Sequence, residues 1–68
     1  MNQEKLQAAF LHLIDTYVAD EELKQFLLPW LEDESVPAKA ILARLEPHMH
    51  GISPADVALL QEIVYHYV

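Results

Sequence analysis

The sequence predicts an all-α fold, a small bundle of four helices or of three long helices and one short one, on three observations. Glycine occurs only once, at Gly51, whereas leucine and alanine are frequent. Apolar residues recur at spacings of three and four, the period of one face of an α-helix. No segment of useful length alternates apolar and polar residues as a half-buried strand would. Because 68 residues leave room for one core, residues 1–68 are expected to form a single domain.

The first helix is expected over residues 3–18. Polar residues such as Lys5, His12 and Asp15 share one face of this segment, and large apolar residues share the other. A helix with a single apolar stripe packs that stripe on the core and exposes its remaining faces. The segment is therefore predicted to be an amphipathic outer helix, with a stripe formed by Leu6, Phe10, Leu13, Ile14 and Tyr17.

The second helix is expected over residues 20–33, with Asp20 as its N-cap and Glu21 and Glu22 complementing the helix dipole. The phase of its apolar stripe passes unchanged through Pro29, which lies on the polar side, so the pattern favours a kink at Pro29. A new short helix that begins at Pro29 is the alternative, since proline is common at the first helical position. Trp30 is expected in the core together with the rest of the stripe, which is Leu23, Phe26, Leu27 and Leu31.

The third helix is expected over residues 36–46. Ser35 and Pro37 supply its start signal, and Arg44 lies near its end, where a cation suits the helix dipole. Pro47 and Gly51 bracket the connection that follows, which has room for one helical turn. The apolar stripe of this helix is Ala38, Ile41, Leu42 and Leu45.

The fourth helix, expected over residues 54–67, has the clearest start signal. Ser53 can accept a hydrogen bond from the backbone of Asp56 while the Asp56 side chain returns one to Ser53, as in a capping box. Pro54 suits the first helical position. The apolar side chains of this helix cover about half of its circumference, whereas one inward face needs an arc of only about 100°. They are Val57, Leu59, Leu60, Ile63, Val64, Tyr67 and Val68.

This wide apolar arc has two interpretations. It is wide enough to touch two neighbours at once, and the second neighbour can be another chain. Alternatively, this is simply the central helix of the bundle, because a small bundle often encloses one helix more than the others.

The charge of the chain argues against nucleic acid as a partner. Eleven acidic and four basic residues give a formal charge of −7. Such a chain repels phosphate backbones and cannot gain from counterion release. A single glycine cannot build a phosphate-binding or dinucleotide-binding loop, so no cofactor is expected.

Residues suited to catalysis or metal binding are scarce. Cysteine is absent, and both serines, Ser35 and Ser53, are assigned to helix starts. Without an available nucleophile the chain is expected not to be an enzyme. His48 and His50 are two residues apart, but structural zinc sites pair their ligands at wider spacings, so no metal site is expected.

The localisation is predicted from what the sequence lacks. Residues 1–5 have neither the basic nor the apolar region of a signal peptide, and Asp56 and Glu62 interrupt the most apolar stretch. The sequence therefore predicts a soluble cytoplasmic protein with no membrane partner.

The apolar content predicts a protein partner. Apolar residues make up 53% of the chain, which exceeds the ~45–50% of an average soluble domain. The excess lies in the last helix, so we expect a regulatory, adaptor or chaperone-like interaction module that forms a homodimer or docks on another protein. The predicted partner-binding residues are Leu59, Ile63, Val64, Tyr65, Tyr67 and Val68.

Two other functions are weighed. An acidic inhibitor or nucleic-acid mimic would present two acidic triplets to a basic site on an enzyme, namely Asp20, Glu21, Glu22, Glu32, Asp33 and Glu34. A DNA-binding helix-turn-helix is the weakest candidate, since the last three helices suit that arrangement but the charge opposes it.

Overall fold

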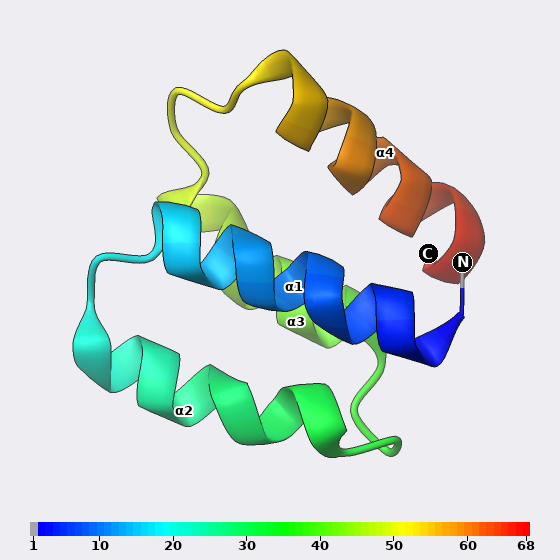
Figure 1. The fold of residues 1–68 in the computed structure, drawn as a ribbon. Coiled ribbons are helices and arrows are strands. Elements are labelled where there is room, and N and C mark those ends of the chain that lie inside the picture. Colours follow the sequence, from blue (N-terminus) through cyan, green and yellow to red (C-terminus); the bar gives the residue numbers. More distant parts are fainter. Residues whose placement is uncertain (1) are drawn as a thin grey trace.

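The computed structural model describes residues 2–68, which form an all-α bundle of four helices (Figure 1). They are α1 (Gln3–Tyr17), α2 (Glu21–Glu32), α3 (Ala38–Leu45) and α4 (Pro54–Tyr67), with a 3-10 helix, η1 (Glu46–His48), directly after α3. Successive helices run in opposite directions, and α1 lies between α2 and α4 with α3 behind it (Figure 1). The predicted fold class is confirmed, and α3 is the short helix.

Helix α1 is the centre of the hydrophobic core. Twelve apolar residues are buried within residues 2–68, of which five lie on α1 and a sixth is its C-cap, Val18. The predicted stripe is correct, and Lys5, His12 and Asp15 are exposed on the opposite face, as predicted for an amphipathic outer helix. The buried face of α1 packs against both α2 and α4. The buried residues of α1 are Leu6, Ala9, Phe10, Leu13 and Ile14.

Helix α2 begins as predicted and runs through Pro29 without interruption. The carboxylate of Asp20 accepts hydrogen bonds from the backbone N–H groups of Glu22 and Leu23, at 3.0 and 3.4 Å. Because α2 is one helix from Glu21 to Glu32, the alternative of a new helix that begins at Pro29 is wrong. Proline removes one backbone hydrogen bond from the helix. Leu27 and Leu31, on either side of Pro29, are buried in the core and hold the helix in place.

Phe26 and Trp30 lie beside the core, whereas the apolar stripe in the sequence predicted that they would lie inside it. Phe26 is 50% exposed and Trp30 is partly buried. Their ring centroids are 5.1 Å apart, and the guanidinium carbon of Arg44 lies 5.8 Å from the centre of the Trp30 ring. The buried face of α2 is centred on Leu27 and Leu31, and the aromatic pair instead joins α2 to α3 through a cation–π contact.

Helix α3 begins two residues later than predicted. The Asp33 carboxylate accepts hydrogen bonds from the backbone N–H and the hydroxyl of Ser35, at 2.9 and 2.6 Å. Ser35 thus belongs to the turn between α2 and α3, and Pro37 is the N-cap of α3. In the connection that follows, η1 is the helical turn, and Gly51 adopts a φ of +62°, a left-handed conformation that suits glycine.

Helix α4 lies at the edge of the bundle. It packs against α1 and α3, and only two of its residues, Asp56 and Ile63, are buried. The alternative in which the last helix is the enclosed, central one is therefore wrong. Within residues 2–68, no helix combines the length and apolar character needed to cross a bilayer.

Candidate interaction surfaces

Exposed apolar side chains concentrate on α4. Within residues 2–68, seven large apolar side chains are exposed, and five of them belong to α4 and its C-cap. Tyr65 is 84% exposed and Val68 61%. The other two, Leu11 and Phe26, lie on different helices. We call the exposed set on the last helix the α4 surface, and it consists of Val57, Val64, Tyr65, Tyr67 and Val68.

The predicted partner-binding residues divide between this surface and the core. Ile63 is completely buried, so its assignment to a contact surface is corrected. It shares a helical stripe with exposed residues, and a stripe alone does not show which of its members faces a neighbouring helix. Leu59 is partly buried against the core. The remaining four residues of the predicted set belong to the α4 surface.

An open apolar groove of about 430 Å³ separates α4 from α3. Leu60 and Val64 line it from α4, so the groove and the α4 surface share Val64. We call this hollow the α3–α4 groove. Its other lining residues come from α3 and the segment after it, and one of them is acidic: Leu42, Leu45, Glu46, Met49 and Ile52.

A polar link attaches the beginning of α4 to the end of α1. The Nε2 atom of His12 donates to Oδ1 of Asp56 at 2.8 Å, and the Tyr17 hydroxyl donates to Oδ2 at 2.5 Å. The backbone N–H of Ser53 donates in turn to the Tyr17 hydroxyl at 3.2 Å. The hydrogen bond from Tyr17, followed by that from His12, lowers the pKa of Asp56 below its ordinary value of 3.8.

This link corrects half of the predicted capping box. Ser53 Oγ accepts from the backbone N–H of Asp56 at 3.3 Å, as expected. The Asp56 side chain, however, turns away from Ser53 towards α1. His12 and Asp56 are 44 positions apart, so no local pattern announces their contact. Because both carboxylate oxygens are used to join two helices, the pair acts as a structural link.

The six residues of the predicted acidic surface are exposed at the two ends of α2. At the first end, Asp20 is the N-cap, and Glu21 and Glu22 lie in the first turn, where negative charge stabilises a helix. At the second end lie Glu32, Asp33 and Glu34. Hydrogen bonds from the Ser35 hydroxyl and backbone N–H lower the pKa of Asp33.

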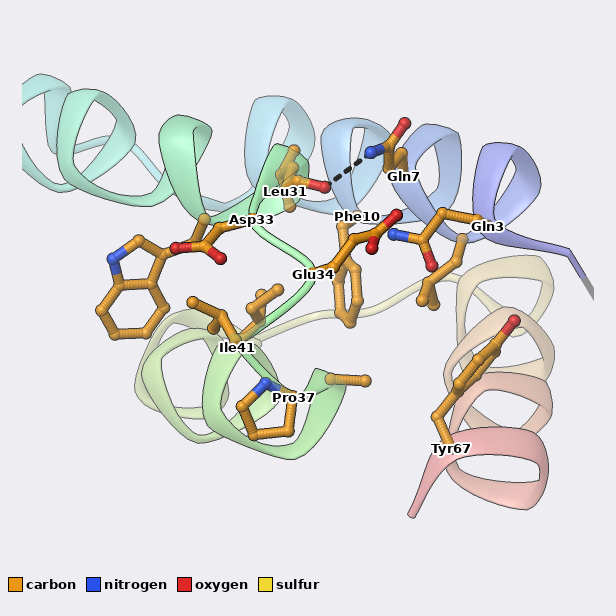
Figure 2. A pocket seen from close by; sticks show the side chains of 13 residues that line it. Gln3, Gln7, Phe10, Leu31, Asp33, Glu34, Pro37, Ile41 and Tyr67 are labelled. Carbon is orange, nitrogen blue, oxygen red and sulfur yellow. Dashed lines mark hydrogen bonds between the residues drawn. The ribbon is translucent and has the colours of Figure 1, made fainter.

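A second hollow, of about 260 Å³, opens beside this C-terminal triplet (Figure 2). Asp33 and Glu34 line it from the turn after α2, and Tyr67 lines it from the end of α4. The side-chain amide of Gln7 donates to the backbone carbonyl of Leu31 at 2.7 Å on one side of the hollow, which joins α1 to α2 (Figure 2). The hollow therefore combines apolar walls with two carboxylates.

The two histidines of the connection between α3 and α4 differ in their exposure. His48 ends η1 and is partly buried, whereas His50 is exposed. Across the described part of the chain, residues 2–68, no three histidine, aspartate or glutamate side chains are grouped as a metal ion would require.

Comparison with known proteins finds no family model, no curated protein and no solved structure that matches this chain.

Proposed function

We propose that this chain is a small non-enzymatic protein-interaction module that associates with a second copy of itself through the α4 surface and the α3–α4 groove, and that the same surface serves other partner proteins. The observation that carries the proposal is the concentration of exposed apolar side chains on α4, five of the seven within residues 2–68. Removing apolar surface from water contributes about 25 cal/mol per Å². Covering this surface would therefore stabilise a complex.

The composition of the α4 surface supports a protein partner. Interface cores are poor in charged residues and rich in aromatic ones such as tyrosine. Between Val57 and Val68 the only aspartate, glutamate, lysine or arginine is Glu62, beside one histidine, His66. Two tyrosines lie in the last turn, Tyr65 and Tyr67.

The distribution of charge supports self-association through this surface in particular. Two copies that each carry a formal charge of −7 repel one another. The repulsion is smallest where they meet through a surface with few charges, and α4 offers one. A symmetric pair uses the same patch on both copies, so one exposed helix face is sufficient to build a dimer.

The second candidate, an acidic inhibitor of an enzyme, is favoured by the triplet Glu32, Asp33 and Glu34, which is exposed at the end of α2. The other acidic triplet, at the beginning of α2, already caps the helix and complements its dipole. The acidic candidate is thus reduced from two triplets to one.

Sedimentation velocity over a range of concentrations tests the proposal. The wild-type chain is expected to form a dimer, and Val64→Glu is expected to remain monomeric because it places a charge at the shared edge of the groove and the surface. Leu11→Glu is the matched control, since Leu11 is 46% exposed and Val64 47%.

Salt distinguishes the two candidates. Apolar association is expected to persist when the salt concentration is raised, whereas binding through an acidic triplet weakens as salt screens the charges. A wild-type chain that is monomeric at every concentration would contradict self-association. Loss of the dimer in Leu11→Glu but not in Val64→Glu would place the contact elsewhere.

A further inference from the structure

A third hollow, an open groove of about 430 Å³, runs between α1 and α2 on a part of the molecule that the proposed dimer does not use. Its apolar lining includes Ala8, Leu11 and Leu28. Leu11 is one of the two exposed large apolar side chains outside the last helix. A carboxylate lies on each wall, Glu4 on α1 and Glu32 on α2.

This groove adjoins the hollow drawn in Figure 2. Gln7 and Leu31 line both, and the hydrogen bond between them marks the boundary (Figure 2). We call the two adjoining hollows together the acidic cleft. Neither part has a lysine, arginine or histidine among its lining residues. Its four carboxylates are those of Glu4, Glu32, Asp33 and Glu34.

The negative charge of the acidic cleft is not balanced by the fold. The C-terminal end of a helix is the negative end of its dipole, so acidic residues there are unfavourable and cations are favourable. Helix α2 has no basic residue in its last turn and ends in Glu32, with Asp33 and Glu34 next. Asp33 at least accepts hydrogen bonds from Ser35.

The other three carboxylates of the acidic cleft are those of Glu4, Glu32 and Glu34. They make no ion pair with any residue from 2 to 68, where the ion pairs are His12–Asp56 and Lys24–Asp15. The same helix begins with a triplet that suits its dipole and caps its backbone, so the two ends of α2 differ in what their acids do for the fold. These acidic residues do not stabilise the fold, and they lie beside an open apolar groove. A ligand with both positive charges and apolar side chains would match this arrangement.

We propose that the acidic cleft binds a basic amphipathic helix of a partner protein. A helix laid into a groove places its apolar side chains on the floor and its charged ones at the walls. Here leucine-sized side chains would pack on Ala8, Leu11 and Leu28, and lysine or arginine would meet the four carboxylates and the last carbonyl groups of α2. The acidic cleft shares only Tyr67 with the α4 surface, and its groove between α1 and α2 shares no residue with that surface. A dimer can therefore carry one such partner in this groove of each copy.

Fluorescence anisotropy with a labelled model peptide tests this site. The probe is a peptide of leucine and lysine only, arranged with helical periodicity, and its control is a scrambled peptide of the same composition. The decisive variant is Glu4→Gln with Glu32→Gln, which removes one carboxylate from each wall. The matched control is Glu21→Gln with Glu62→Gln, which changes the net charge equally. Circular dichroism of both variants checks that they are folded.

The expected result is an affinity loss of about fivefold or more in the cleft variant and of less than about twofold in the control, because short-range charge pairing exceeds the effect of net charge. Leu11→Gln is expected to weaken binding as well, whereas Val64→Glu leaves it unchanged. Three outcomes would overturn the proposal: equal losses in the two double variants, equal binding of the scrambled peptide, or loss of binding in Val64→Glu with none in the cleft variant. The dimer is measured separately, so the two proposals fail independently.

Discussion

Helices α1 and α4 have nearly the same length and apolar content but opposite positions in the fold. Eight of the 15 residues of α1 are apolar, and nine of the 14 residues of α4. Yet α1 buries five apolar residues and α4 only Ile63. The apolar side chains of α1 lie between neighbours on several sides, whereas those of α4 extend from the core edge onto the surface. Apolar content alone therefore does not distinguish a helix that buries its apolar side chains from one that exposes them.

The two helices also differ in what attaches them. Helix α1 is held chiefly by side-chain packing. Helix α4 is held by the buried Ile63, by Leu59 and Leu60 at the edge of the core, and by the hydrogen bonds that Asp56 accepts from His12 and Tyr17. Hydrogen bonds between polar side chains fix the position of a helix without burying its apolar face. This division leaves the α4 surface available for another molecule.

The largest effect on stability is expected in α1. Leu13 is completely buried, and Leu13→Ala is expected to lower the free energy of unfolding by about 3–5 kcal/mol, through lost burial and the cavity left behind. Urea denaturation followed by circular dichroism measures the loss. Leu11→Ala on the same helix is the control and is expected to change it by less than about 0.5 kcal/mol. Equal effects would contradict the burial assigned to α1.

A smaller loss is expected for the buried apolar residue of α4. Ile63→Ala is expected to cost about 2–4 kcal/mol, because the cost of a cavity falls when the surroundings can collapse into it. A helix at the edge of the bundle can shift more readily than the central one. Hydrogen exchange should show faster exchange in α4 than in α1 in this variant. If hydrogen exchange became faster by the same factor in both helices, α4 would not open independently of α1, and the separate attachment of α4 would be contradicted.

The Asp56 link predicts a dependence of stability on pH. Because the pKa of Asp56 is lower in the folded chain than its ordinary 3.8, its contribution is complete above that value and is lost as pH falls through the folded-state pKa. The free energy of unfolding should therefore decrease with pH below about 4. Asp56→Asn should show a shallower decrease, with the remainder from Asp33, whose pKa is also lowered. Identical acid profiles of variant and wild type would contradict the link.

The smallest effect on stability is expected on the α4 surface. Tyr65 is exposed and its ring contacts the adjacent His66 ring at 5.1 Å between centroids. Tyr65→Ser is therefore expected to change the stability of the monomer by less than about 0.5 kcal/mol, while weakening the dimer. Urea denaturation at a concentration below the dimerisation range measures the first and sedimentation the second. A large loss of monomer stability would show that Tyr65 serves the fold.

Local patterns predicted those parts of the fold that local interactions determine. The stripe of α1 and the N-caps Asp20 and Ser53 were correct because periodicity and capping involve residues within one or two turns. The turn at Ser35 was misplaced because two acceptable start signals, Ser35 and Pro37, lie close together.

Tertiary contacts were not predictable in this way. The link between His12 and Asp56 spans 44 positions, and nothing around either residue announces the other. Ile63 and Val64 are adjacent and equally apolar, and only the position of α1 and α3 decides that one is buried and the other exposed. The candidate surface was therefore predicted as a helix, but not residue by residue.

The central claim is that the α4 surface is a protein-binding surface, and an NMR dilution series tests it most directly. As the concentration of the wild-type chain rises, amide resonances of Val57, Val64, Tyr65 and Val68 are expected to shift or broaden together, while those of Leu13 and of the residues lining the groove between α1 and α2 remain in place. Spectra that do not change with concentration, or changes confined to α2, would contradict the account.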